Sequence, residues 1–131
     1  MSHKSIRILY WIITGLFAAF MFFDGIVKIG WPSLGAEITQ QLGYPLYLLT
    51  ILGIANLLGS LALVQQKCRT LTEWAYAGFT IYFIGASLSH VFSGDSVAEI
   101  ISPLIFLAVL LFSYYLWKER HRTLLNLSVN I

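Results

Sequence analysis

The chain has 131 residues, of which 58% are hydrophobic and 11% are charged. A soluble domain has about 25% charged residues, and a soluble fold of this length buries too little surface to hide so many apolar side chains. The aromatic content of 15% excludes a disordered chain, and a formal net charge of +2 gives no reason to expect a nucleic-acid partner. The composition predicts an all-α membrane protein, surrounded by the lipid bilayer, with one domain over residues 1–131.

Four apolar segments are long enough to cross a bilayer, which takes roughly 20 residues of helix. The first segment is uncharged from Ile8 to Phe23. Because bulky side chains at 20–23 stand where a secretory signal would have small residues for cleavage, we expect this segment to be a retained helix. The expected spans are about 8–28, 44–64, 74–92 and 98–117, and they predict a four-helix transmembrane bundle.

A shorter helix is expected at about 33–42, between the first and second spans. Leu34, Ile38 and Leu42 recur at four-residue intervals, whereas the residues between them include Glu37 and two glutamines. A segment with one apolar face that is too short and too polar to span is typical of an amphipathic helix. We expect it to lie along the membrane interface or in the mouth of the bundle.

The basic residues indicate the orientation of the bundle. With four spans, both termini and the middle loop share one side of the membrane, and that side has every lysine and arginine except Lys28. Because positively charged loops stay in the cytoplasm, we expect both termini to be cytoplasmic. The basic residues on the expected cytoplasmic side are Lys4, Arg7, Lys67, Arg69, Lys118, Arg120 and Arg122.

Three ionisable residues from three different spans are expected at the same depth. At a helical rise of about 1.5 Å per residue, Asp24 and His90 lie roughly 24 Å, and Glu99 roughly 27 Å, from the cytoplasmic boundary. Charged groups at this depth are costly and persist where they pair or line a wet cavity. Asp24, His90 and Glu99 are therefore the candidate catalytic residues, and a histidine beside carboxylates could relay protons.

Structural roles explain the same residues and stay open as alternatives. Asp24 and Lys28 are four residues apart, so they can pair with each other and simply end the first span. His90 can form a single structural hydrogen bond at the interface, where Asp95 and Glu99 are both available.

The third span presents a face that combines hydroxyl and aromatic groups. At 100° per residue, four of its side chains fall with His90 within an arc of about 80°. This face either lines a small-molecule cavity or forms ordinary interhelical hydrogen bonds. Gly78 and Gly85 lie on the opposite side, where we expect a neighbouring helix to approach closely. The four side chains are Tyr76, Thr80, Phe83 and Ser87.

The second span has one strongly polar residue near its middle, Asn56, which shares a face with Gly53 and Ser60. We expect this face to meet another helix, where Asn56 forms an interhelical hydrogen bond or contacts a ligand. The candidate ligand-binding residues are Lys28, Asn56, Tyr76, Thr80, Phe83, Ser87 and Asp95.

The sequence predicts no metal centre. Cys68 is the only cysteine, which excludes an intrachain disulfide and a CxxC motif for zinc or thiol exchange. His3 and His121 lie near the termini, so His90 alone is expected within the membrane. Ligation of a haem by two intramembrane histidines is therefore excluded.

Several short motifs follow one another in a distinctive order. They are Leu42-Gly43-Tyr44-Pro45, the glycine-containing stretches at 52–54 and 57–59, Glu73-Trp74-Ala75-Tyr76-Ala77-Gly78-Phe79, and Ser89-His90 followed by Gly94-Asp95. In order and spacing, this set resembles the DoxX-like family of small membrane proteins over roughly residues 10–117. One position departs from the resemblance, because many relatives have a lysine where this chain has Asn56.

The resemblance implies a four-helix bundle in a bacterial cytoplasmic membrane. The family takes its name from a subunit of a quinone-linked thiosulfate oxidoreductase, and some members are associated with membrane redox complexes. The first hypothesis is therefore a redox subunit that binds a quinone or a similar lipid-soluble molecule, while a membrane redox partner supplies the electrons. The alternatives are a non-enzymatic scaffold or assembly factor, and a small-solute or proton conduit built from a homo-oligomer. The sequence leaves open whether the protein is an enzyme.

Overall fold

The computed structural model describes residues 2–65 and 67–129, and all regular secondary structure in this part of the chain is helical. The expected short helix is present between the first and second long helices. The elements in chain order are α1 (His3–Gly30), α2 (Ser33–Gln41), α3 (Tyr47–Val64), α4 (Arg69–Phe92) and α5 (Val97–Val129).

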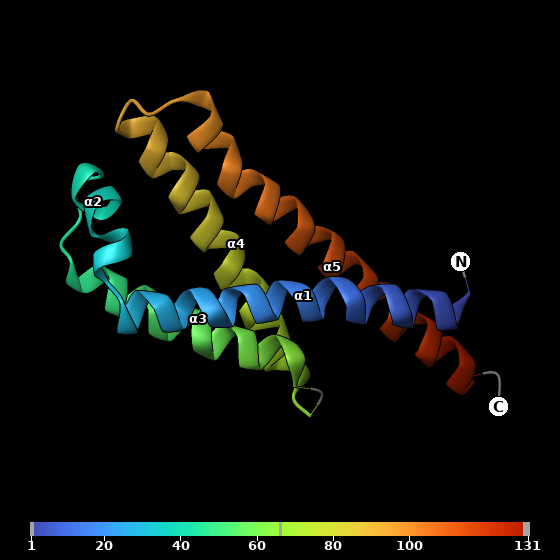
Figure 1. Ribbon diagram of the computed structural model, residues 1–131. Coiled ribbons are helices and arrows are strands. Elements are labelled where there is room, and N and C mark those ends of the chain that lie inside the picture. The colour runs from blue at the N-terminus through green and yellow to red at the C-terminus, as the bar shows by residue number, and fades with distance from the viewer. Residues whose placement is uncertain (1, 66, 130–131) are drawn as a thin grey trace.

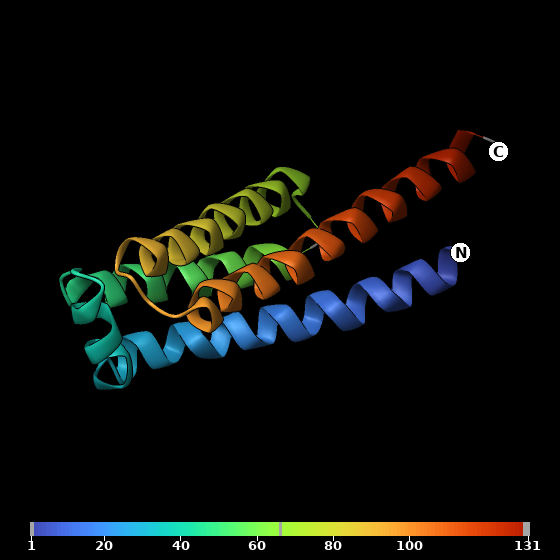
Figure 2. The same cartoon turned by 90° about the horizontal axis from the view of Figure 1, so that it is seen from above.

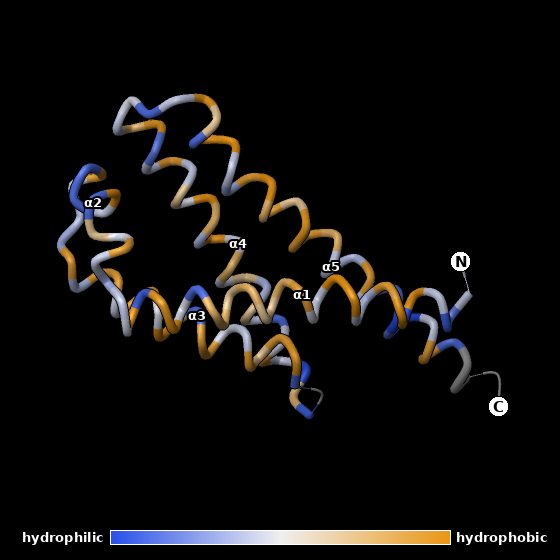
Figure 3. Tube along the Cα trace, in the orientation of Figure 1, coloured by the Kyte–Doolittle hydropathy of each residue, from blue (hydrophilic) through white to orange (hydrophobic). Residues whose placement is uncertain are grey.

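Four of the described helices, α1, α3, α4 and α5, are long and apolar enough to cross a membrane. Figure 3 shows apolar residues along these four helices and polar residues at their ends and in α2. Large apolar side chains cover their outer surfaces, and Leu16 and Ile81 are 69% and 72% exposed. Such surfaces are stable when they contact lipid. The predicted fold class, an all-α four-helix membrane bundle, is therefore confirmed.

The bundle consists of two antiparallel pairs, in which α1 packs along α3 and α4 packs along α5. Both termini lie at one end, which we call the inner end, whereas α2 and the α4–α5 turn lie at the other, the outer end (Figures 1 and 2). In Figure 1 the two pairs diverge towards the outer end. The shared end of the termini agrees with the expected topology, and its cytoplasmic location stays a prediction.

Three helices extend beyond the spans that apolar residues alone indicate, and the first of them, α1, begins at His3 and not at about residue 8. α4 begins at Arg69 because the Gln65 side chain closes a tight turn, in which its Oε1 accepts from the Cys68 backbone N–H at 2.8 Å. α5 continues past the expected end at 117 as a polar helix to Val129. There the Arg120 guanidinium lies 5.5 Å from the centre of the Tyr10 ring, so the basic segment packs on α1.

The α1–α3 pair is close because two glycines face each other. A Cβ added to Gly53 would lie 2.9 Å from the Gly25 carbonyl oxygen, a separation that real Cβ atoms essentially never show. The expectation that the face with Gly53 meets a helix is confirmed. Gly78 and Gly85 do not meet another helix of the described chain, because a Cβ at either position would have no atom within 4 Å. The expectation of internal packing was therefore wrong for these two glycines, and the alternative of contact with a second copy stays a prediction. These two glycines face outwards.

Polar groups also join helices inside the inner half of the bundle. The Ser113 hydroxyl lies 2.5 Å from Thr14 Oγ1 and 2.7 Å from the Tyr76 hydroxyl, which links α5 to α1 and α4. All three side chains are buried. On the side of this group nearer the outer end, the space is filled by aromatic rings such as Phe17 and Phe79, which meet edge to face at 5.5 Å. This packing fixes the three helices whose outer ends hold the candidate site.

Candidate functional site

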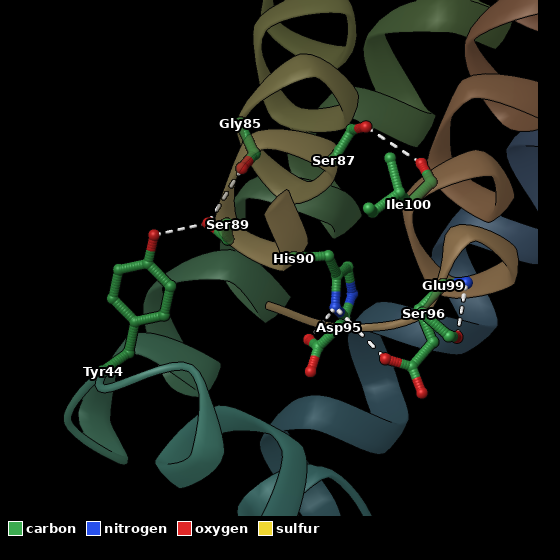
Figure 4. Close-up of polar contacts among 9 residues, drawn as sticks. All are labelled: Tyr44, Gly85, Ser87, Ser89, His90, Asp95, Ser96, Glu99 and Ile100. Atoms are coloured by element: carbon green, nitrogen blue, oxygen red, sulfur yellow. Dashed lines mark hydrogen bonds and ion pairs between the residues drawn. The ribbon is translucent and has the colours of Figure 1, made fainter. Parts of the chain in front are cut away.

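The outer end is organised by the turn between α4 and α5. Gly94 adopts a positive φ of 73°, which a residue with a side chain rarely adopts and which turns the chain back on itself. The Asp95 backbone N–H then donates to the His90 carbonyl at 3.0 Å. On the opposite side, the Tyr44 hydroxyl, which follows α2, lies 2.5 Å from Ser89 Oγ (Figure 4). The loop that follows α2 is thereby held against α4.

Asp24 is the centre of the first polar cluster. Its Oδ2 forms an ion pair with the Lys28 ammonium one turn later on α1, which is the pairing that the four-residue spacing predicts. Asn56, 1% exposed, donates to the same oxygen from α3 at 2.9 Å. Because Asn56 lies one turn from Gly53, the close glycine contact brings its amide within reach of the carboxylate. Asn56 is thus an interhelical hydrogen-bond donor to an ionisable group.

A cavity of about 220 Å³ lies beside this ion pair, between α1, α4 and α5. Asp24 and Lys28 form its polar part. The Phe106 ring stacks on Phe20 at 5.1 Å and on Phe83 at 5.7 Å, so one wall of the cavity is aromatic. Its other lining residues include Met21, Tyr82, Ser102 and Pro103.

His90 is the centre of the second polar cluster, shown in Figure 4. Its Nδ1 lies 2.6 Å from Asp95 Oδ2 and 4.0 Å from Glu99 Oε2. The side chains of His90 and Asp95 are 17% and 26% exposed, whereas that of Glu99 is 55% exposed. A cavity of about 230 Å³ adjoins the three groups and is also lined by Ile38 and Gln41 of α2.

The two cavities are neighbours, because Ser102 and Pro103 line both. Asp24 lines the first cavity, whereas His90 and Glu99 line the second. The three candidate catalytic residues therefore gather at the outer end, as their expected depths indicate, but in two adjacent cavities. α5 forms the wall between these cavities.

The hydroxyl face of the third span serves mainly internal hydrogen bonding. The Thr80 hydroxyl donates to the Tyr76 carbonyl at 2.7 Å, and the Ser87 hydroxyl donates to the Ile100 carbonyl of α5 at 2.9 Å. Tyr76 contacts Ser113 in the core. Phe83 is the one member of this predicted face, apart from His90, that lines either outer cavity. The alternative of interhelical hydrogen bonding therefore holds for Tyr76 and Ser87, whereas the Thr80 hydroxyl bonds within α4.

Sequence reasoning predicted Glu99 but missed the other residues of α5 that line the two cavities, Ser102, Pro103 and Phe106. Glu99, Ser102, Pro103 and Phe106 follow one another at intervals of three, one and three residues, which places them on one face of a helix. That signal was present in the sequence. Tyr82 was missed because it lies beside, and not within, the hydroxyl face of the third span.

A third and larger hollow runs between α3 and α4. It has a volume of about 770 Å³, and nearly all of its surface is apolar. Leu58 and Trp74, at 63% and 70% exposure, stand along its outward side. Tyr82 lines both this groove and the Asp24 cavity, and Asn56 lies in the groove wall. The apolar groove therefore adjoins the first polar cluster.

The fold and these cavities define a multi-pass integral membrane protein with polar groups at one end of a four-helix bundle. A comparison with known protein families matches residues 12–113 to the DoxX-like family. The chain therefore belongs to the DoxX-like family, and the matched region contains both polar clusters. Comparisons with curated proteins and with solved structures gave no match.

Proposed function

We propose that this protein binds a quinone-like molecule in the Asp24 cavity and acts as a subunit of a membrane redox system. The observation that carries the proposal is the composition of this cavity. It combines an aromatic wall with the Asp24–Lys28 ion pair inside a membrane-spanning bundle. Apolar pockets with a few convergent polar groups are typical small-molecule sites, and intramembrane ionisable residues favour a functional role.

The two parts of the cavity fit the two parts of a quinone head group. The planar ring packs against Phe106 and Phe83, whose own rings are nearly parallel at 9°. The Lys28 ammonium donates a hydrogen bond to a ring carbonyl, and Asp24 accepts a proton when the reduced ring releases one. Reduction of the two carbonyls to hydroxyls takes two electrons and two protons. A separate redox protein supplies the electrons, and water at the outer end supplies the two protons. When the reduced ring is oxidised again both protons are released, and Asp24 accepts one of them while the other returns to water.

The α3–α4 groove supplies room for the apolar tail that makes such a molecule soluble in lipid. Tyr82 borders both the groove and the head-group cavity, and we expect one ligand to occupy the two together. The Asn56 amide stands at the junction and holds Asp24 in place. We therefore expect a quinone with an isoprenoid tail to bind more tightly than the same ring without one, because tail burial adds apolar contact area.

We also place this protein in a bacterial cytoplasmic membrane, with the inner end facing the cytoplasm. The basic residues support this orientation, since Lys28 is the only lysine or arginine at the outer end of the described chain, and it is paired with Asp24. The proposed head-group cavity then lies near the outer surface of the membrane.

The test is ligand retention by the purified protein in lipid nanodiscs. Bound quinone is extracted and quantified after equilibration with a tailed ubiquinone or menaquinone. The Lys28→Met variant should bind about 10- to 100-fold more weakly, which corresponds to the loss of one hydrogen bond to a charged group. Glu73→Gln is the matched control, because Glu73 forms an ion pair with Lys118 at the inner end.

Two outcomes contradict the proposal. Equal quinone affinity in wild type, Lys28→Met and Phe106→Ala would remove the Asp24 cavity as the binding site. If wild type retains no quinone, and the same variants instead lower stability together with recovery of a partner protein, the protein is a scaffold.

A further inference from the structure

The second polar cluster has the composition and spacing of a metal site. One imidazole nitrogen and two carboxylate oxygens, from His90, Asp95 and Glu99, all lie within 4.8 Å of one another. The distances from His90 Nδ1 are 2.6 Å to Asp95 Oδ2 and 4.0 Å to Glu99 Oε2. Ligand atoms of a tetrahedral zinc ion, at bonds of about 2.1 Å, stand about 3.4 Å apart. The observed distances lie on either side of this value, so small side-chain rotations suffice to complete the site.

The backbone holds the three donors in place. The α4–α5 turn is closed by the hydrogen bond from the Asp95 N–H to the His90 carbonyl. The Ser96 hydroxyl accepts from the Glu99 N–H at 3.4 Å at the start of α5, and the Ser87 hydroxyl ties α4 to the Ile100 carbonyl. Figure 4 shows the Ser96–Glu99 and Ser87–Ile100 hydrogen bonds beside the cluster. Donors on a fixed turn and two helix ends lose little freedom when they bind an ion.

The charged groups that line the second cavity favour a bound cation. A single imidazole nitrogen donates at most one hydrogen, and two carboxylates face His90 Nδ1. The second cavity has no lysine or arginine among its described lining residues. Lys28 lines the first cavity, where it is paired with Asp24. A divalent ion would neutralise both carboxylates at once, and a cavity of about 230 Å³ leaves room for its water ligands.

We propose that His90, Asp95 and Glu99 form a binding site for a divalent transition-metal ion, zinc above all, at the outer end of the bundle. An imidazole with two carboxylates suits zinc or manganese, whereas calcium and magnesium prefer oxygen ligands alone. Ser102 and Gln41 line the cavity and can bind the metal's water ligands. The ion joins α4 to α5 across their turn. The site lies on the other side of Pro103 from the proposed quinone cavity and does not depend on it.

The experiment measures metal binding directly. The full-length protein in nanodiscs is stripped with a chelator and titrated calorimetrically with zinc chloride, with manganese and calcium chloride as comparison titrants. We expect one zinc ion per chain and little heat from calcium. Asp95→Asn and Glu99→Gln should each weaken zinc binding by at least about tenfold, since disturbing even the outer shell of a metal site has effects of this size. Glu37→Gln, on α2 at the same end, should bind like wild type.

A second readout separates a lost ligand from a lost fold. Cobalt binding to the same donors should give visible absorption bands, and zinc should displace them. A His90→Cys variant replaces the imidazole with a thiolate, which is also a zinc ligand, so it should retain zinc while shifting the cobalt spectrum. The proposal is wrong if wild type binds no zinc, or if zinc binding is unchanged in Asp95→Asn and Glu99→Gln. Quinone retention enters neither result, so the two proposals can fail separately.

Discussion

The contact between Gly25 and Gly53 is the feature of the fold whose energetic effect can be tested most directly. A Cβ at Gly53 would lie 2.6 Å from Ile29 Cγ1 and 2.9 Å from the Gly25 carbonyl oxygen. The Ile29 side chain can rotate, but the backbone oxygen moves only if α1 and α3 separate. Inserting an atom into a packed interface costs about 1–3 kcal/mol. Gly53→Ala should therefore destabilise the bundle, and it should also weaken the Asn56–Asp24 hydrogen bond.

The matched control is Gly78→Ala, because a Cβ there meets no atom within 4 Å. Alanine gains up to about 1 kcal/mol over glycine in a helix at both positions. The difference between the two variants then isolates packing, and we expect Gly53→Ala to be about 1–3 kcal/mol less stable than Gly78→Ala. Reversible unfolding in mixed micelles measures both values. Equal stabilities, or a more stable Gly53→Ala, would refute the close α1–α3 contact.

Three further predictions concern other parts of the bundle. Ser113→Ala removes the group that joins Thr14 to Tyr76, so it should lower the unfolding free energy by about 0.6–1.7 kcal/mol, whereas Thr70→Ala at an exposed position of α4 should not. Lys28→Met leaves the Asp24 carboxylate without its cation and should lower the unfolding free energy by about 1–3 kcal/mol. The Asp24→Asn/Lys28→Met double variant should recover most of this loss. If it does not, the broken ion pair is not the cause of the loss. Cys68 is exposed in the α3–α4 turn, so a membrane-impermeant maleimide should label it in inside-out vesicles and not in intact cells. A Cys68→Ser/Ser93→Cys variant should be labelled in intact cells and not in inside-out vesicles. If Cys68 is labelled in intact cells instead, the termini lie outside the cell.

The sequence predicts the number, order and approximate position of the membrane helices well, because the bilayer imposes a length and an apolar composition on each span. It also predicts the Asp24–Lys28 pair, since four-residue spacing brings two side chains together on any helix. It predicts the face of α3 with Gly53 and Asn56 because that face concentrates small and polar residues. These features depend on local geometry or on the solvent, and both can be inferred from residue order.

The features that the sequence did not reveal depend on how helices are placed beside one another. Position 78 and position 53 are both glycine in a membrane helix, yet only Gly53 faces a neighbouring backbone. Similarly, equal depth brings Asp24 and His90 to the same end, but depth says nothing about rotation around the bundle axis. The stretch around Ser102 and Pro103 stands between these residues and divides the polar region into two cavities. Whether Asp24 and His90 share one cavity depends on how α5 packs against the other helices. The residue pattern of a single helix does not contain that information.

Asn56 shows how the arrangement of charges favours an amide at a position where the resemblance to the family leads us to expect lysine. The Asp24 oxygen that accepts from Asn56 is the same oxygen that contacts Lys28. A lysine at position 56 would bring a second ammonium to one carboxylate, in a part of the membrane where unpaired charge is costly. An amide instead satisfies the carboxylate without adding charge, because Lys28 already balances Asp24. Asn56→Lys should therefore require a further anion, such as a reduced and deprotonated ligand, to reach the stability of the wild-type bundle.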